Sequence, residues 1–269
     1  MVERVKVARQ HFVDQVDGAC ASMGARVTWH SERWIAEIAH GSGQFFVIGQ
    51  TFPLNDAASA NIANDKAATY SVLSARTIAA VPHHMARFGL LGDVRGVAGF
   101  VRSIAGLPVV LKPHRESAGI DVVRAHDDAE LVGALEALAA KYRAITVSPF
   151  LRIRDETRVV VLDSEVLLTY RKVVADGPEW RHNLCCGAKP EVIPVSDRDD
   201  RMTELALRAM DALRLRFATV DVVDVDGELS VLEVNSGVTL EHFSRSGAEQ
   251  EEAAREIYRR ALLACAGSG

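Results

Sequence analysis

Ala218–Asn235 has the sequence ATVDVVDVDGELSVLEVN, and this stretch decides the fold. Two runs rich in β-branched residues flank Asp226-Gly227, a dipeptide typical of two-residue hairpin turns. Asp221 lies in the first predicted strand, and Glu233 and Asn235 lie in the second. Because side chains two apart on a strand share a face, Glu233 and Asn235 present a carboxylate and an amide oxygen together. Such oxygen ligands suit Mg²⁺.

The register of this hairpin decides whether Asp221 can join Glu233. A simple two-residue turn pairs Val225 with Glu228 and Asp221 with Leu232, which puts Asp221 and Glu233 on opposite faces. We therefore expect a longer loop or a bulge that places Asp221 across from Glu233. The partners of Thr219, Val223 and Val225 are then Asn235, Val231 and Leu229. From the spacing alone, a plain buried hairpin with polar ends is an equal alternative.

Length and composition indicate an ordinary globular protein. The 269 residues can form one large domain or two to three small lobes, with 48% hydrophobic and 25% charged residues. The net charge of −5 argues against a nucleic-acid partner. No apolar run is long enough for a membrane span or a secretory signal, so we expect a cytoplasmic protein with no membrane partner. The cysteines show neither zinc-binding nor disulfide spacing and are expected to be reduced: Cys20, Cys185, Cys186 and Cys265.

The pattern of helix and strand signals divides the chain into three parts. We predict a short N-terminal lobe over 1–52, linker helices with a small subdomain over 53–148, and a large C-terminal subdomain over 149–269. The expected helices are 3–23, Asn55 or Asp56 to Ser74, 95–105, 128–142, 199–215 and 247–264. The expected strands are 26–29, 34–38, 44–48, 109–112, 120–123, 144–151, and a pair, 156–162 and 165–173, that turns at Asp163-Ser164.

Lys112 ends an apolar strand, where a charged side chain needs a partner. A nucleotide phosphate would be one, although most strand-end lysines are structural or exposed. The following loop, Pro113–Gly119, supplies N–H groups and basic side chains that can wrap phosphate oxygens. It matches neither the P-loop nor the dinucleotide-binding glycine pattern.

Arginines gather in the segment that follows. Arg158 and Arg171 lie on the predicted strand pair, and Arg181 and Asn183 come shortly after it. Guanidinium groups near metal ligands indicate a bound polyanion, because they pair with phosphate or carboxylate in a fixed geometry. An exposed sheet face with salt bridges is the alternative, and His182 is more often a surface residue than a catalytic base.

The order of these features resembles the ATP-grasp superfamily, and more narrowly the branch of the ribosomal-protein glutamate ligase. The resemblance covers about residues 52 to 262, and its motifs are Asn64-Asp65-Lys66, Leu107–Pro113 (LPVVLKP), Arg158, Arg181–Leu184 (RHNL), Asp221 and Glu233-Val234-Asn235. It implies an α+β fold in which two lobes clasp ATP, here with a shortened N-terminal lobe. It also implies an ATP-dependent carboxylate–amine ligase.

The resemblance also implies roles for individual residues. Lys66 and Lys112 match the lysines that hold ATP phosphates, and Arg158 or Arg171 would add positive charge at the transferring group. Mg²⁺, in two ions and with Mn²⁺ as an alternative, would be bound by Asp221, Glu233 and Asn235. The remaining nucleotide contacts would be Ser148, Pro149 and Phe150 at the adenine hinge, Glu156, Arg181, His182 and Asn183, with Leu232 packed against the adenine ring.

The sequence departs from the family pattern at three points. The identity of the substrates is therefore the implication that carries over least well from the resemblance. The phosphate loop is poor in glycine and carries Asp121, the hinge is Ser-Pro-Phe, and the N-terminal lobe has only about 50 residues. The expected partners are a small-molecule or peptide carboxylate and an amine acceptor, and a homodimer stays open. An ATP-binding regulatory protein of the same fold and a small-molecule kinase are the rival interpretations.

Overall fold

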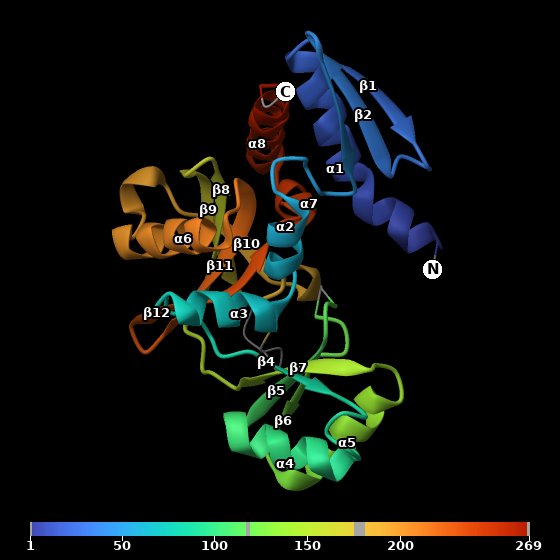
Figure 1. The fold of residues 1–269 in the computed structure, drawn as a ribbon. Helices are drawn as coiled ribbons and strands as arrows, with labels where there is room; N and C mark the ends of the chain where they lie inside the picture. The colour runs from blue at the N-terminus through green and yellow to red at the C-terminus, as the bar shows by residue number, and fades with distance from the viewer. Residues whose placement is uncertain (1, 117–118, 175–180, 268–269) are drawn as a thin grey trace.

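The computed structural model describes residues 2–116, 119–174 and 181–267, with side chains from residue 10 onward. Within these ranges, three antiparallel sheets follow one another along the chain and helices pack against them (Figure 1). Helices and antiparallel sheets in separate groups confirm the α+β prediction. No helix in the described ranges combines the length and apolar character that a membrane span requires.

The N-terminal elements share an apolar core with the C-terminal helix. They are α1 (Val2–Ser22), β1 (Arg26–His30), β2 (Ile35–His40) and β3 (Gly43–Ile48), and α1 packs against α8 (Ala248–Ala266) (Figure 1). The Phe52 ring lies 5.1 Å from that of Phe217 and 5.9 Å from that of Tyr258, centroid to centroid. Residues from both ends of the chain therefore form one core, and the domain boundary at residue 52 stays a prediction.

The segment expected to be one helix up to Ser74 forms two, α2 (Ala57–Ala63) and α3 (Lys66–Ala75). The reason is a second N-cap. The Asp56 carboxylate accepts hydrogen bonds from the first N–H groups of α2, and the Asp65 carboxylate does the same for α3. Lys66 is thus the first residue of α3, and its side chain reaches Glu233 in the large sheet.

The small sheet contains four strands in the order β4-β7-β5-β6, covered by α4 and α5 (Figure 1). Its elements are β4 (His84–Arg87), α4 (Val94–Ala105), β5 (Val109–Pro113), β6 (Val123–Ala125), α5 (Asp128–Ala139) and β7 (Ala144–Pro149). Strand β4 was not predicted, and β6 begins where the predicted strand 120–123 was to end. The alternating side chains of β5 place Lys112 away from the core of α4 and α5.

The large sheet contains five strands in the order β10-β9-β8-β11-β12. Its elements are β8 (Asp155–Leu162), β9 (Glu165–Val173), β10 (Lys189–Val192), α6 (Asp200–Leu213), β11 (Phe217–Val225), β12 (Glu228–Asn235) and the short α7 (Glu241–Ser244), with 3-10 turns at Leu184–Cys186 and Val195–Asp197. Helix α6 packs against one face of the sheet. Eight of the nine residues of β11 are buried, which explains its nearly continuous apolar sequence.

The β11–β12 hairpin combines a two-residue turn with a bulge. Asp226 and Gly227 both have positive φ, 55° and 89°, and Val225 pairs with Glu228. The register shifts between Asp221 and Val222, so Leu232 is left without a partner and Asp221 pairs with Glu233. The expected Asp221–Glu233 pairing is confirmed. The expected pairs of Val223 with Val231 and of Val225 with Leu229 are wrong, because the bulge lies farther from the turn than these residues.

The β8–β9 hairpin contains the same combination. Leu162 pairs with Glu165 across the predicted turn at residues 163 and 164, and the register shifts between Val160 and Val161, leaving Leu167 unpaired. Without the bulge, Arg171 would pair with Glu156 and share a face with Arg158. With it, Arg158 pairs with Tyr170, and Arg171 faces the other side of the sheet.

Candidate functional site

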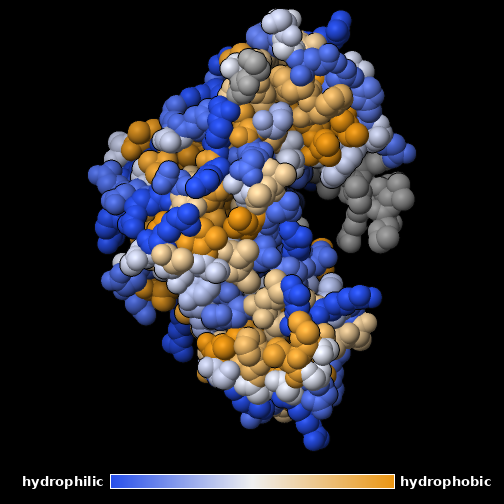
Figure 2. All heavy atoms as spheres, in the orientation of Figure 1, coloured by the Kyte–Doolittle hydropathy of each residue, from blue (hydrophilic) through white to orange (hydrophobic). Residues whose placement is uncertain are grey.

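A cavity of about 1110 Å³ lies between the small and the large sheet. Figure 2 shows the molecule hollowed beside the lower lobe, which is built on the small sheet, with hydrophilic side chains around the hollow. The predicted site residues that line the cavity are Lys66, Lys112, Ser148, Pro149, Phe150, Glu156, Arg158, Arg181, His182, Asn183, Leu232, Glu233 and Asn235. Segments far apart in the sequence therefore meet here.

Asp221 lies beneath the cavity floor and is fully buried. Arg158 holds it with two hydrogen bonds, from Nε to Oδ1 at 2.7 Å and from Nη2 to Oδ2 at 2.6 Å. Lys172 Nζ donates to the same Oδ2 at 2.8 Å and also to Glu156. Burial and the nearby Arg158 oppose the charge on Lys172, but the two carboxylates outweigh them and raise its pKa. Two cations and two anions thus balance one another at the cavity floor.

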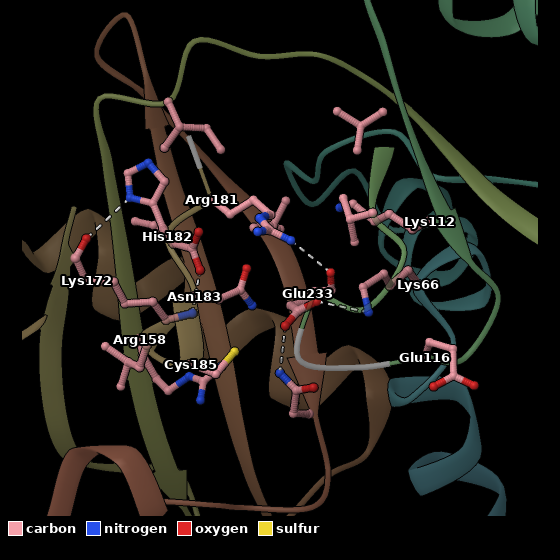
Figure 3. A pocket seen from close by; sticks show the side chains of 18 of the residues that line it. Lys66, Lys112, Glu116, Arg158, Lys172, Arg181, His182, Asn183, Cys185 and Glu233 are labelled. Atoms are coloured by element: carbon pink, nitrogen blue, oxygen red, sulfur yellow. Dashed lines mark hydrogen bonds and ion pairs between the residues drawn. The ribbon is translucent and has the colours of Figure 1, made fainter. Parts of the chain in front are cut away.

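Glu233 connects this network to α3. Its Oε2 lies 3.0 Å from Lys66 Nζ, and its Oε1 accepts a hydrogen bond from Asn235 Nδ2 at 3.3 Å (Figure 3). Burial alone would raise the pKa of Glu233, but the surrounding cations, first Lys66 and then Lys172, hold it well below its usual range. The Glu233 charge in turn raises the pKa of Lys66. Both groups are therefore charged at neutral pH.

Lys112 approaches from the small sheet (Figure 3). Its Nζ lies 3.3 Å from Nε2 of the buried His83. Burial lowers the pKa of Lys112 to about 8, and Lys66 contributes in the same direction. Two lysines from different lobes thus face one cavity with opposite pKa shifts, because Lys66 has a carboxylate partner and Lys112 has none close enough to offset its burial.

The donor set of Asp221, Glu233 and Asn235 fits Mg²⁺ chemically. Two carboxylates and an amide oxygen come from paired positions, since Asp221 is opposite Glu233 and Thr219 is opposite Asn235. Within the described ranges, no group of three or more His, Cys, Asp and Glu side chains is arranged to hold a metal ion. A divalent ion at this trio would replace positive charge that Lys66, Arg158 and Lys172 now supply.

The hinge at Ser148–Phe150 offers few hydrogen-bond donors. Pro149 has no N–H, and the N–H of Phe150 donates to the carbonyl of Pro108 at 3.0 Å. Arg124 lies over the Phe150 ring, 4.8 Å from its centroid. Leu232, the bulged residue of β12, lines the cavity as well. Neither Pro149 nor Phe150 can therefore donate a backbone hydrogen bond to a base.

The loop at Pro113–Gly119 contacts the chain on two sides of the cavity. Residues 117 and 118 of this loop lie outside the described ranges. On one side, Arg115 Nη2 donates to Asn61 Oδ1 at 3.0 Å. On the other, Arg181 Nη1 donates to the Gly119 carbonyl at 3.1 Å. The loop is thus tied to α2 and to the segment that carries Asn183.

The structure does not bring Arg171 to the cavity. This residue lines a second cavity of about 300 Å³ on the opposite face of the large sheet. There its Nε lies 3.2 Å from Asp155 Oδ1 and its Nη1 lies 3.5 Å from Glu191 Oε2. The physical reason is the bulge at Leu167, which turns Arg171 away and turns Lys172 inward. Arg171 therefore has no part in the site.

Sequence reasoning missed Lys172 and His83. The position of Lys172 depends on the bulge in β9, for which the sequence carries no clear signal. His83 precedes the unpredicted strand β4, and the sequence Pro82-His83-His84 gives no indication that the first histidine is buried. His242 and Thr239, after β12, also line the cavity, and burial lowers the pKa of His242.

The chain is similar to known proteins over most of its length. The RimK-like ATP-grasp domain model matches residues 63–258. A probable alpha-L-glutamate ligase of Shewanella loihica is 28% identical over 200 residues, covering 74% of this chain and 63% of the relative. One of Vibrio vulnificus is 25% identical over 246 residues, covering 91% and 75%. The chain thus spans under two thirds of the Shewanella relative's length and three quarters of the Vibrio one's.

Solved structures show the same fold. The D-alanine–D-alanine ligase of Bacillus anthracis superposes with a TM-score of 0.59 at 19% identity, covering 80% of this chain and 72% of that one. The ATP-grasp ligase PsnB, solved with a minimal precursor, superposes with a TM-score of 0.52 at 20% identity, covering 77% and 63%. These likenesses confirm the ATP-grasp fold. With the family match over most of its length, the chain belongs to the RimK-like ATP-grasp domain family.

Proposed function

We propose that this protein is an ATP-dependent carboxylate–amine ligase that releases ADP and phosphate. The observation that carries the proposal is the meeting of Lys66, Lys112 and Glu233 in one cavity between two sheets. Cations from both lobes can hold a polyphosphate there, beside carboxylates suited to its metal ions. The names of the relatives, alpha-L-glutamate ligases, support the same reaction class.

In this proposal, Lys66 and Lys112 hold the ATP phosphates and Arg158 stabilises the transferring group. Mg²⁺, for which Mn²⁺ could substitute, would be held by Asp221, Glu233 and Asn235 and would neutralise phosphate charge. Adenine would lie at the hinge against Leu232, with its amino group facing carbonyl oxygens, because the amides of residues 149 and 150 cannot donate. The remaining nucleotide contacts would come from Glu156 and from Arg181, His182 and Asn183.

The chemistry proceeds in two steps. A substrate carboxylate oxygen attacks the γ-phosphorus of ATP, and the bond to the bridging oxygen breaks to release ADP. An amine then attacks the acyl carbon, phosphate leaves, and the amine loses a proton as the amide forms. Arg158 and the two lysines supply fixed positive charge in both steps. The Pro113–Gly119 loop, tied to Arg181 and Asn61, would exclude water from the acyl phosphate.

Hydroxylamine provides a test that does not require the natural amine. The protein is incubated with ATP, Mg²⁺ and a panel of amino acids, short peptides and other carboxylates, with hydroxylamine as the common acceptor. The expected result is ADP release together with a hydroxamate for at least one carboxylate. Glu233→Gln serves as the inactive control and Arg171→Ala as the active one.

Two results would favour the rivals. ATP binding without carboxylate-dependent ADP release across the panel would indicate a regulatory nucleotide-binding protein. A stable phosphorylated hydroxyl compound formed without any amide or hydroxamate would indicate a kinase.

A further inference from the structure

His83 lies where the chain crosses from the large sheet to the small one. Before it, the N–H of Val81 donates to the Val231 carbonyl and the N–H of Val231 donates to the Ala79 carbonyl, both at 2.9 Å. After it, His84 pairs with Val147 in the small sheet. Val231 lies two positions before Glu233 on β12. The main chain on the near side of His83 is therefore fixed to the strand that carries the proposed metal ligands.

The hydrogen bonds of the His83 ring define its tautomer. Nδ1 lies 3.0 Å from the Val81 carbonyl oxygen. A carbonyl can only accept, so Nδ1 must carry the proton, and the neutral ring then has a bare lone pair on Nε2. Nε2 lies 3.3 Å from Lys112 Nζ, an ammonium group that can only donate. The Val81 carbonyl can thus only accept and the Lys112 ammonium group can only donate, so the direction of both hydrogen bonds is fixed.

The surroundings keep the ring in this neutral form. His83 is 2% exposed, and burial, followed by the charge of Lys112, lowers its pKa well below the usual value. Lys66 acts in the same direction and Glu233 opposes it. A second proton on the ring would remove the acceptor and place two cations in contact. The ring therefore remains an acceptor for Lys112 throughout the neutral range.

We propose that His83 is a positioning residue that holds the Lys112 ammonium group toward the nucleotide phosphates and fixes the position of that group relative to β12. The lysine side chain has four rotatable bonds, and its own strand belongs to the small sheet. The chain of contacts from Val231 through Val81 and His83 to Lys112 links that strand to the opposite lobe. Pre-ordering the ammonium group lowers the entropy lost when phosphate binds. This inference rests on the proposed role of Lys112 in ATP binding.

Nitrogen NMR of the intact protein tests the contact without any loss of fold. Histidine ring signals should show His83 protonated at Nδ1 and bare at Nε2 from pH 6 to pH 8. The Nε2 shift should move in Lys112→Met, whose unbranched side chain is one atom shorter and has no donor. A proton on Nε2, or an Nε2 signal indifferent to Lys112→Met, overturns the proposal.

A double-mutant cycle tests the consequence. His83→Leu should weaken ATP binding about three- to tenfold, the usual worth of one such hydrogen bond, and leave the affinity for adenosine, which has no phosphates, unchanged. His83→Gln keeps an acceptor on the side chain and should recover most of the loss. In the Lys112→Met background, His83→Leu should have no further effect.

A wrong assignment of Lys112 and a wrong role for His83 would give different binding results. If Lys112→Met binds ATP as tightly as the wild type, the assignment of Lys112 in the proposed function is wrong. If Lys112→Met loses ATP binding but His83→Leu does not, only the role of His83 is wrong. An equal loss of ATP and adenosine binding in His83→Leu would indicate general damage to the fold and also contradict the proposal.

Discussion

The Nζ of Lys66, the first residue of α3, lies 3.0 Å from Oε2 of Glu233 on β12. This contact is possible because the Asp65 carboxylate caps the N-terminus of α3, which makes Lys66 the first residue of a helix at the cavity edge. The pair holds a carboxylate in its ionised form at the place where the proposed metal ions would bind. Lys66 and Glu233 are therefore ordered by their mutual charges before any ligand arrives.

Glu233→Gln should abolish ATP turnover, with a fall of about 100-fold or more, because the amide cannot neutralise a metal ion or hold Lys66 by charge. Steady-state ADP release measures the effect, and thermal melting shows whether the fold is retained. Glu228→Gln, at the exposed start of the same strand, is the matched control and should have wild-type turnover. Full activity of Glu233→Gln would contradict the site.

Asp221→Ala should lower the free energy of unfolding by about 3–5 kcal/mol, because it leaves Arg158 and the buried Lys172 with an uncompensated charge. Urea unfolding measures this change. Asp163→Ala removes an ion pair with Arg216 in which both side chains are more than 40% exposed, and should cost at most about 1 kcal/mol. Similar losses in the two variants would mean that the buried network adds little.

Arg158→Gln and Arg171→Ala should differ sharply although both residues lie on the same hairpin. Arg158 lines the cavity, so its loss should reduce the rate of ADP release by about 100-fold. Arg171 faces the other side of the sheet, and Arg171→Ala should turn over ATP at close to the wild-type rate. Rates are compared per mole of folded protein. A severe defect in Arg171→Ala would show that the face assignment is wrong.

ATP affinity should fall as the pH rises through the region of pH 8. Burial lowers the pKa of Lys112 from 10.5 to about 8, and phosphate binds the charged form. Between pH 8 and 10.5 the folded protein binds fewer protons at Lys112 than the unfolded chain does. This group therefore makes the ligand-free protein more stable as pH rises through that window, while ATP binding weakens.

Titration calorimetry from pH 7 to pH 9.5 checks the affinity, and Lys112→Arg is the control because arginine stays charged. The fall in affinity above pH 8 should be absent or much smaller in that variant. The same decline in both proteins would assign the pH effect to another group.

The fold class followed from the family resemblance that the order of the polar motifs carries, and all the predicted site residues except Asp221 and Arg171 line the cavity. Charged residues at strand ends, such as Lys112, and the Glu-x-Asn pair at Glu233 need polar partners, and this need is visible in the sequence. The helix N-cap at Asp65 was also visible in principle. It was missed because the alanine-rich segment around it favours one continuous helix.

The face of each strand residue was harder to predict, and Arg171 shows why. Alternation assigns a face only while the register is unbroken, and a single bulge reverses it. The two hairpins of the large sheet each contain a bulge a few residues from a simple two-residue turn. Nothing in the local sequence of Leu167 or Leu232 distinguishes these leucines from their paired neighbours. The position of each bulge therefore depends on which charged side chains the whole sheet buries.

The bulge at Leu232 makes the length of β12 as important as its composition. Deleting Leu232 would remove the bulge and leave the other pairs of the hairpin in place, because Val222 already pairs with Val231 and Asp221 with Glu233. Glu233 and Asn235 would keep their face toward the cavity. Straightening the strand with Leu232 retained has the opposite effect, because Asp221 would then pair with Leu232, and Glu233 and Asn235 would move to the face packed against α6. Among natural relatives, a gap at this one position is therefore compatible with an intact site. Designers who shorten the hairpin should remove the bulged residue and keep the paired ones.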